Sequence, residues 1–437
     1  MFRGLSLRIF TVVCLVILAD LTVGAQRRPE TSRITSSPTS GTIVISGKVQ
    51  ALGAIPASAM PSVEQDQAQQ AAPSQPTAGL TIVPTFDPSV PPAMQTLITT
   101  TIVPLYQNTF TDPITVPILF RFATTDACNG SAIPTSEGGR SNFQATFQPW
   151  TTYINALAAD TPKSANDNAA FATLPPALSP NVVISTANGR AVGLPTPAGA
   201  SSCVALSGFD GIVTLQSATA FSFTRPPLAN TLDAQRVLEH EIDEVLGIGS
   251  YLDIGTTDVR PEDIWTFSGP TARNITTVGT RYFSLDNGNT SVILLNQVAG
   301  ADHGDWDFAG CPSARPLVQD ATICAGQSAD VSRTTPEGIV LDVIGYNLSI
   351  TSAANVGISG RVLTSAGAAI RRARITIADQ NGRTWAVATN AFGYYSLNDI
   401  PSGQEYTVSA LARGFTFQPR LVSVTDAISA MDIVALP

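Results

Sequence analysis

The sequence predicts an α+β domain, built from a mixed sheet beside one well-formed helix, followed by a small all-β sandwich. Two observations carry this prediction. Between residues 80 and 250, strand-like and helix-like patterns alternate, which is typical of a mixed sheet covered by helices. After residue 357 the apolar–polar alternation of strands takes over, interrupted by turn dipeptides such as Asn381-Gly382.

The composition is that of an acidic chain with few charges. Of 437 residues only 13% are charged, the net charge is −9, and 44% are hydrophobic. This length predicts one to three domains, and the apolar fraction is sufficient for a core. No basic patch occurs, so nucleic acid is not an expected partner.

The N-terminus has the pattern of an export signal. Arg3 and Arg8 flank the start of an apolar run, Ile9–Leu18, that is shorter than the ~20 residues needed to span a bilayer. Small residues then precede Gln26, as at a signal-peptide cleavage site. We therefore expect residues 1–25 to be removed, the mature chain to be secreted or extracytoplasmic, and no later segment to span a membrane.

The next stretch, residues 26–76, is rich in Pro, Ser, Gln and Ala and is predicted to be a linker or propeptide. Within it, Thr42–Leu52 is compatible with a lone strand. No cysteine is available there to block a metal site. The predicted domains are then 77–350 for the mixed α+β unit and 351–437 for the β-sandwich.

The larger domain is expected to contain four strands and four helices besides its central helix. Pro104 should break or kink the first of these helices. The predicted strands are Leu80–Phe86, Ile114–Phe122, Val182–Ser185 and Ile212–Leu215, and the predicted helices are Pro91–Asn108, Trp150–Ala159, Ser164–Leu174 and Thr335–Tyr346.

The strongest helix signal in the chain lies between Asn230 and Ser250. Asn230 or Thr231 can cap its start, and Gly247 stands where a residue with positive φ ends a helix. One face is apolar, formed by Leu238, Ile242, Val245 and Leu246.

A second face of this helix carries metal-competent side chains. His240 and Glu244 lie one turn apart and can reach one metal ion, while Glu241 beside them can take a proton from a metal-bound water. The chain has only two histidines, which weighs against a chance pattern. The alternative interpretation is a solvated acidic face, and Asp233, Glu239 and Asp243 are interpreted as solvated or capping charges.

The other histidine stands in a second group of possible ligands, Ala301–Asp307, about 60 residues further on. His303, Asp305 and, as a weaker candidate, Asp302 are its possible ligands. Imidazole is the better zinc ligand, which favours His303.

Four cysteines remain after removal of residues 1–25, and an even number in an oxidising compartment favours disulfides. We expect the pairs Cys311–Cys324 and Cys128–Cys203. A cysteine metal site is disfavoured because no C-x-x-C spacing occurs.

The order of these pieces resembles the zincin peptidases, and within them the metzincin and leishmanolysin-like groups. Their helix carries His-Glu-x-x-His-x-x-Gly; here Glu244 replaces the second histidine and Gly247 is retained. Ser250, at the third-ligand position of a short metzincin, is a poor ligand. The chain is also similar to exported bacterial metalloproteases of the His-Glu-x-x-Glu type, through the segments Tyr282-Phe283-Ser284, Gly304-Asp305-Trp306 and Leu341–Tyr346.

The resemblance implies a zincin-like fold and a secreted zinc-dependent endopeptidase acting on proteins or peptides. It implies Zn²⁺ held by His240, Glu244 and a third ligand, with Glu241 as general base. Comparison with the His-Trp segment of leishmanolysin-like peptidases favours Asp305 as third ligand, so His303 and Asp305 both remain open. No Met stands where a metzincin turn beneath the metal carries one, and TPEGIVLD is a candidate to take its place.

Residues 351–437 separately resemble the carboxypeptidase-regulatory-like domain, a transthyretin-like or immunoglobulin-like β-sandwich. The resemblance rests on Ser359–Val362, Ala373–Ile377, Thr389–Tyr395 and Ile400–Tyr406. Fold resemblance says little about chemistry. Two other functions therefore stay open: a catalytically inactive zincin-like binding or surface protein, and an adhesive or glycan-binding protein that acts through the sandwich.

Overall fold

The chain divides into two compact units in the computed structural model. The first contains Met1–Gln107 and Asp112–Tyr346, and the second contains Asn108–Thr111 and Asn347–Pro437. The predicted signal peptide lies outside the described residues, as do parts 26–41 and 60–76 of the predicted linker. The structure describes residues 42–59, 79–199, 203–252, 258–308, 310–349, 356–379, 383–401, 404–424 and 427–436.

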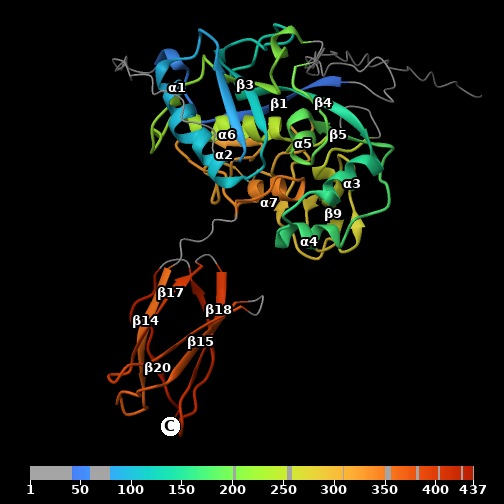
Figure 1. Ribbon diagram of the computed structural model, residues 1–437. Coiled ribbons are helices and arrows are strands. Elements are labelled where there is room, and N and C mark those ends of the chain that lie inside the picture. The colour runs from blue at the N-terminus through green and yellow to red at the C-terminus, as the bar shows by residue number, and fades with distance from the viewer. Residues whose placement is uncertain are drawn as a thin grey trace, which may run out of the picture. The chain divides into compact units, whose positions relative to one another are not determined.

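A mixed sheet of seven strands forms the centre of the first unit, as the sequence predicts (Figure 1). The order along the sheet is β13-β1-β4-β6-β3-β2, with β5 paired to β4. β2, β3 and β6 pair in parallel, whereas β4 is antiparallel to β1, β5 and β6. The strands are β1 (Thr42–Leu52), β2 (Thr81–Phe86), β3 (Thr115–Ala123), β4 (Glu137–Pro149), β5 (Asn181–Ser185), β6 (Gly211–Gln216) and β13 (Thr322–Cys324).

The run Thr42–Leu52 is a strand with the predicted bounds, but it is an inner strand of the sheet and neither a lone strand nor part of a linker. β1 pairs with β4 from Thr42 to Gln50 and with β13 from Gln50 to Leu52. A strand with partners on both sides belongs to the fold of the first unit.

The longest strand, β4, was not predicted at all. It contains Gly138 and Gly139 as well as Arg140, Ser141 and Asn142, residues that disfavour a strand prediction. Most of it is nevertheless buried, because it lies between β1 and β6 with helix α6 against one face.

The helices largely follow the predicted ranges. Pro104 does not end the first of them: α1 (Pro92–Leu97) continues through a π-helical stretch, η2 (Ile98–Ile102), into α2 (Val103–Thr109). The wider turn accommodates the proline ring and its missing N–H. The others are α3 (Trp150–Ala159), α4 (Ala165–Phe171), α5 (Thr186–Ala191), α6 (Ala234–Leu246) and α7 (Pro336–Val343).

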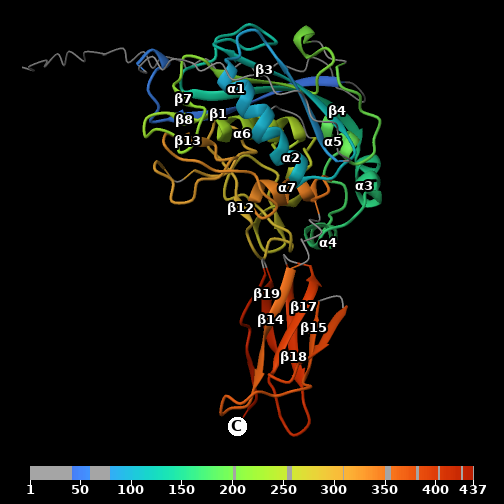
Figure 2. The same ribbon diagram turned by 60° about the vertical axis from the view of Figure 1, so that its left-hand side comes forward.

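Helix α6 lies across one face of the sheet, against β4, β6 and β1, with α7 on its other side (Figures 1 and 2). Every residue of α6 is buried. Short elements complete the unit: β7 (Phe221–Ser222), β8 (Leu232–Asp233), β9 (Thr266–Gly269), β10 (Ala272–Arg273), β11 (Tyr282–Phe283), β12 (Ile293–Leu294), and the 3₁₀ turns η1 (Ala57–Ala59), η3 (Val204–Leu206) and η4 (Glu262–Trp265).

Both predicted disulfides are present. Cys128 pairs with Cys203 at a Cα–Cα distance of 5.1 Å, and Cys311 pairs with Cys324 at 5.6 Å. Two such bonds are typical of proteins that fold in an oxidising compartment. Among the described residues, no helix has the length and apolar character needed to cross a membrane.

The second unit is a β-sandwich, as predicted, with seven strands in its described residues. One sheet has the order β17-β14-β20 and the other β16-β15-β18-β19. Alternate residues of both sheets form a shared apolar core that includes Ile358, Ile375 and Tyr406. The strands are β14 (Val356–Leu363), β15 (Arg374–Ala378), β16 (Thr384–Ala388), β17 (Tyr394–Ile400), β18 (Gln404–Leu411), β19 (Arg420–Val424) and β20 (Ile433–Val434).

Candidate metal centre

Helix α6 begins later than the sequence suggests. Asp233, not Asn230 or Thr231, is its N-cap, and its side chain accepts a hydrogen bond from Gln235 N at 3.2 Å. The preceding Leu232 and Asp233 pair with β7 and so cannot join the helix. At the other end Gly247 has φ +133°, as expected for the residue that turns the chain out of the helix.

The charged residues predicted to be solvated on α6 are buried and hydrogen-bonded instead. Tyr106 donates to Asp243 Oδ1 at 2.6 Å. Glu239 accepts from Val331 N and from Gln235 Nε2, each at 2.8 Å. Periodicity shows which residues share a face, but it does not show that a second layer covers that face.

His240, Glu241 and Glu244 come together as a group whose ligand atoms all lie within 4.8 Å of one another. All three side chains are buried, under strands β1 and β4. His240 Nε2 lies 3.8 Å from Glu244 Oε1. The structure therefore brings together the helix part of the predicted site.

The tautomer of His240 follows from its contacts. Its Nδ1 lies 3.0 Å from the Val318 carbonyl oxygen, which can only accept, so Nδ1 carries the proton. Burial lowers the pKa of His240 to about 3, so the ring is neutral. Nε2 then presents its lone pair toward the carboxylates, which is the form that a metal ion requires.

Asp305 reaches this group from the second predicted segment. Its Oδ1 lies 3.5 Å from His240 Nε2 and accepts from Gln319 Nε2 at 3.0 Å. The close approach depends on Gly304, where a Cβ would lie 2.2 Å from Gly249 Cα in the turn after α6. The loop thus packs backbone to backbone on the end of the helix segment.

His303 is buried but is not part of the His240 group among the described residues. Its Nδ1 lies 3.1 Å from the Asn296 carbonyl oxygen, and its own carbonyl accepts from Arg281 Nη1 at 2.7 Å. Asp302 is held differently, by Lys48 N at 3.2 Å from Oδ2. Of the candidates from this loop, the geometry favours Asp305 as third ligand.

The residues that surround the carboxylates were not predicted from the sequence. Ser141 donates to Glu244 Oε2 at 2.5 Å, and Gln319 contacts both His240 and Asp305. Two glycines make room: a Cβ on Gly47 would lie 1.9 Å from Glu244 Oε2, and one on Gly139 would lie 2.7 Å from Glu241 Oε1. Only the unusual pair Gly138-Gly139 could have signalled a close approach to this strand.

The group has more buried carboxylates than hydrogen-bond donors. Among the described residues, no donor group reaches Oδ2 of Asp305 or either oxygen of Glu241, and the side chain that Glu241 faces is the Glu244 carboxyl group. Burial, and then the charge of Glu244, raise the pKa of Glu241 well above its usual range. Burial and then Asp302 raise the pKa of Glu244 to about 8 and that of Asp305 well above normal. Such a group needs protons or a cation to offset its charge.

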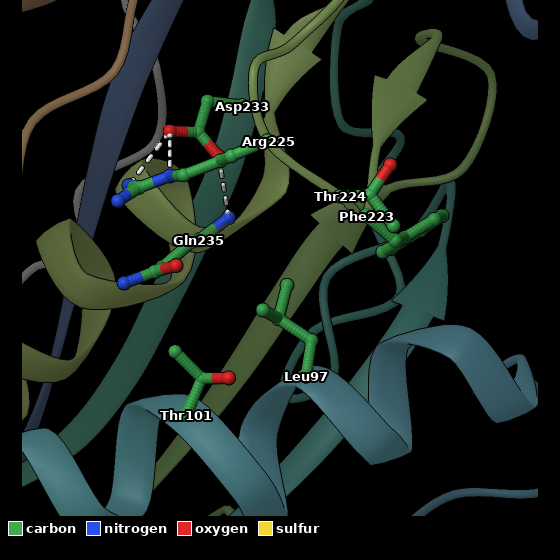
Figure 3. A pocket seen from close by; sticks show the side chains of 7 residues that line it. All are labelled: Leu97, Thr101, Phe223, Thr224, Arg225, Asp233 and Gln235. Carbon is green, nitrogen blue, oxygen red and sulfur yellow. Dashed lines mark hydrogen bonds and ion pairs between the residues drawn. The ribbon is translucent and has the colours of Figure 1, made fainter.

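A cavity of about 290 Å³ lies at the other end of α6, beside Arg225 and Gln235 (Figure 3). Leu97 and Phe223 form its apolar walls. Arg225 is already paired with Asp233 at 2.7 Å and with Asp330. The polar groups of this cavity are therefore engaged in holding the helix start, seven residues before His240.

Comparison with known proteins identifies the second unit. Residues 357–434 match the carboxypeptidase regulatory-like domain family, which confirms the resemblance found in the sequence. No curated protein matches the chain.

Several solved structures share limited similarity. The Bacillus anthracis TIE protein is 14% identical, with a TM-score of 0.16, and the match covers 19% of this chain and 17% of that one. A shaft pilin, spaA from Lactobacillus rhamnosus GG, is 12% identical with a TM-score of 0.17, over 19% and 47%. Catechol 1,2-dioxygenase from Acinetobacter is 10% identical with a TM-score of 0.16, over 17% and 38%. These values support no conclusion about function.

Proposed function

We propose that this protein is an extracytoplasmic zinc-dependent peptidase of zincin-like fold. The observation that carries the proposal is the buried group of His240, Glu241 and Glu244, with Asp305 Oδ1 3.5 Å from His240 Nε2. The two disulfides support export, because they require an oxidising compartment.

The donor set fits Zn²⁺. One neutral imidazole nitrogen and two carboxylates are ordinary zinc ligands, and three protein ligands leave a position for water or substrate. The groups that hold the proposed ligands in position fit as well: the Val318 carbonyl orients His240, and the Ser141 hydroxyl donates to Glu244 Oε2. The excess negative charge of the group is what a divalent cation offsets.

Glu241 is then the general base. A bound zinc ion would polarise the scissile carbonyl and lower the pKa of water beside it. Glu241, which lies beside His240 and Glu244 and meets no hydrogen-bond donor in the described residues, is placed to take the proton of such a water. The same carboxyl group can pass this proton to the leaving amine.

A second candidate function is favoured by one observation, the burial of the group. His240 and Glu241 are each 0% exposed, and Glu244 is 3% exposed. A peptide reaches Glu241 only if the segments covering it move. If they do not move, the same residues form a closed metal site that stabilises a catalytically inactive binding or surface protein.

One set of measurements separates these functions. Zinc content and cleavage of a fluorescein-labelled casein are measured for the purified full chain and for Glu241→Gln. We expect about one zinc per chain in both, and cleavage only in the wild type. Zinc without cleavage in the wild type would favour the closed metal site, and no zinc even after incubation with the metal would overturn both.

A further inference from the structure

One end of the C-terminal sandwich exposes large apolar side chains. Six of them are between 41% and 71% exposed. An isolated exposed apolar residue is ordinary on a protein surface, but a gathering of them marks an interaction site. The six residues, which we name the apolar tip, are Phe392, Tyr394, Leu411, Phe415, Val434 and Leu436.

The strand registers place these residues at the same end. Tyr394 pairs with Arg361 in β14, and Val434 pairs with Leu363 two residues further along the same strand. Leu436 N donates to Thr416 O, next to Phe415. In the second sheet, Leu411 pairs with Arg374 where β15 begins. The apolar tip therefore lies at the end of the sandwich where β14 finishes and β15 begins.

Arginines accompany the apolar tip. Arg361 and Arg374 pair with tip residues, Arg371 and Arg372 directly precede β15, and Arg413 lies in the turn between Ala412 and Phe415. The guanidinium of Arg361 lies 4.8 Å from the centre of the Tyr394 ring and also donates to Phe392 O. Cations stacked on exposed rings are typical of side chains that stay near a polar interface.

Carboxylates gather at the opposite end. Asp399 lies beside Ile400, which pairs with the first residue of β14, and Asp379 follows the last residue of β15. Among the described residues, Asp432 is the one carboxylate at the tip end, where it accepts from Arg361 N at 2.8 Å. Residues 351–437 contain seven arginines against five carboxylates, a charge of +2, in a chain whose net charge is −9.

We infer that the apolar tip and its arginines dock the sandwich onto an anionic phospholipid bilayer. The six apolar side chains enter the boundary between headgroups and acyl chains, and the arginines bind lipid phosphates. An anionic polysaccharide would use the same arginines, but it offers no apolar layer for Leu411, Val434 or Leu436. Those aliphatic side chains, which cannot stack on sugars as aromatic rings do, favour the bilayer.

Vesicle sedimentation tests this inference with the full chain. Binding to vesicles of phosphatidylglycerol and phosphatidylcholine is compared with binding to phosphatidylcholine alone, at low and high salt. We expect binding to the anionic vesicles, weakened by salt. No binding to anionic vesicles at low salt would overturn the inference.

Two variants separate the lipid from other polyanions. Leu411→Ser with Leu436→Ser removes apolar insertion, and Arg371→Gln with Arg413→Gln removes two charges. We expect each pair to weaken vesicle binding by about tenfold or more. Loss of binding only in the arginine pair, together with equal binding to heparin, would show a general polyanion site and not a bilayer site.

Matched controls lie away from the tip. Val278 and Leu228 are 70% and 55% exposed in the first unit. Val278→Ser with Leu228→Ser therefore removes exposed apolar area, as the tip variant does, but at a place away from the tip. Arg383 lies next to Thr384, which pairs with the last residue of β15, and its guanidinium carbon lies 4.7 Å from the centre of the Trp385 ring. Arg383→Gln therefore controls for the loss of an arginine away from the tip. Both controls should bind as the wild type does; weakening equal to that of the tip variants would contradict a site at the tip.

Discussion

The two histidines of this chain, His240 and His303, are anchored in the same way but differ in the side chains that surround them. Both rings are buried, and each Nδ1 faces a backbone carbonyl, at 3.0 Å for His240 and 3.1 Å for His303. Within the described residues, His240 alone of the two has carboxylates near Nε2, with Asp305 at 3.5 Å and Glu244 at 3.8 Å. The contrast teaches that anchoring of Nδ1 prepares a histidine as a ligand, but what faces Nε2 decides whether a metal can be held.

The largest expected effect separates the two histidines directly. His240→Ala should abolish stoichiometric zinc binding, because it removes the one nitrogen ligand of the group. His303→Ala should leave zinc bound, because His303 is not in the group. Zinc per chain after dialysis is measured by atomic absorption, together with the circular dichroism spectrum of each variant. Zinc loss in His303→Ala with a retained fold would reverse the assignment of the third ligand.

Glu241→Gln sharpens the comparison within the His240 segment. The amide keeps the size of the side chain but cannot accept the proton, so casein cleavage should fall by about 10²–10⁴-fold. Zinc content should be retained, because Glu241 is assigned as base and not as ligand. Unchanged cleavage would show that another group takes the proton.

Gly47→Ala tests the space beneath β1. A methyl group there would lie 1.9 Å from Glu244 Oε2, so the carboxylate must move away from His240. We expect zinc affinity to fall by roughly 10–100-fold, the usual range for disturbed supporting contacts. Gly269→Ala is the control, because its added Cβ meets nothing within 4 Å. Equal affinity in both variants would mean that Glu244 is not a ligand.

The smallest expected effect is a decrease in stability with rising pH that bound zinc reduces. Without metal, the pKa of Glu244 is raised by burial from 4.5 to about 8. The folded chain then binds more protons than the unfolded chain between these values, so its free energy of unfolding falls as pH rises through that window. We expect Tm of the metal-free protein to fall by roughly 5 °C or more across it.

Zinc-loaded protein should lose less stability over the same pH range, because the cation offsets the charge of the ionised carboxylates. Other buried acids such as Glu239, whose pKa is also raised to about 8, contribute equally to both forms. The informative quantity is therefore the difference between zinc-loaded and metal-free protein in how far Tm falls with pH. Calorimetry measures Tm in both forms. His240→Ala is the control, and its Tm should depend on pH in the same way with and without zinc. If the wild type also showed the same pH dependence with and without zinc, the proposed metal site would be contradicted.

Local pattern alone was sufficient for several parts of this protein. The α6 helix, its Gly247 end and the His240–Glu244 spacing follow from residues within four positions of each other, which one helical turn brings together. The sandwich was equally predictable, since hairpin turns and two-residue alternation are short-range signals. Cysteine number and export context led to the correct disulfide pairs.

Only the tertiary structure decided how the site is enclosed. β4 escaped prediction, and β1 was predicted only as a lone strand, because both cover carboxylates and so carry Gly47, Gly139 and Ser141 where an apolar core would select larger side chains. The choice of Asp305 over His303 depends on the packing of Gly304 against Gly249, two residues far apart in the chain. Periodicity reports which side of an element avoids water; it carries no information about which distant backbone comes to lie there, and that contact defines the candidate metal centre.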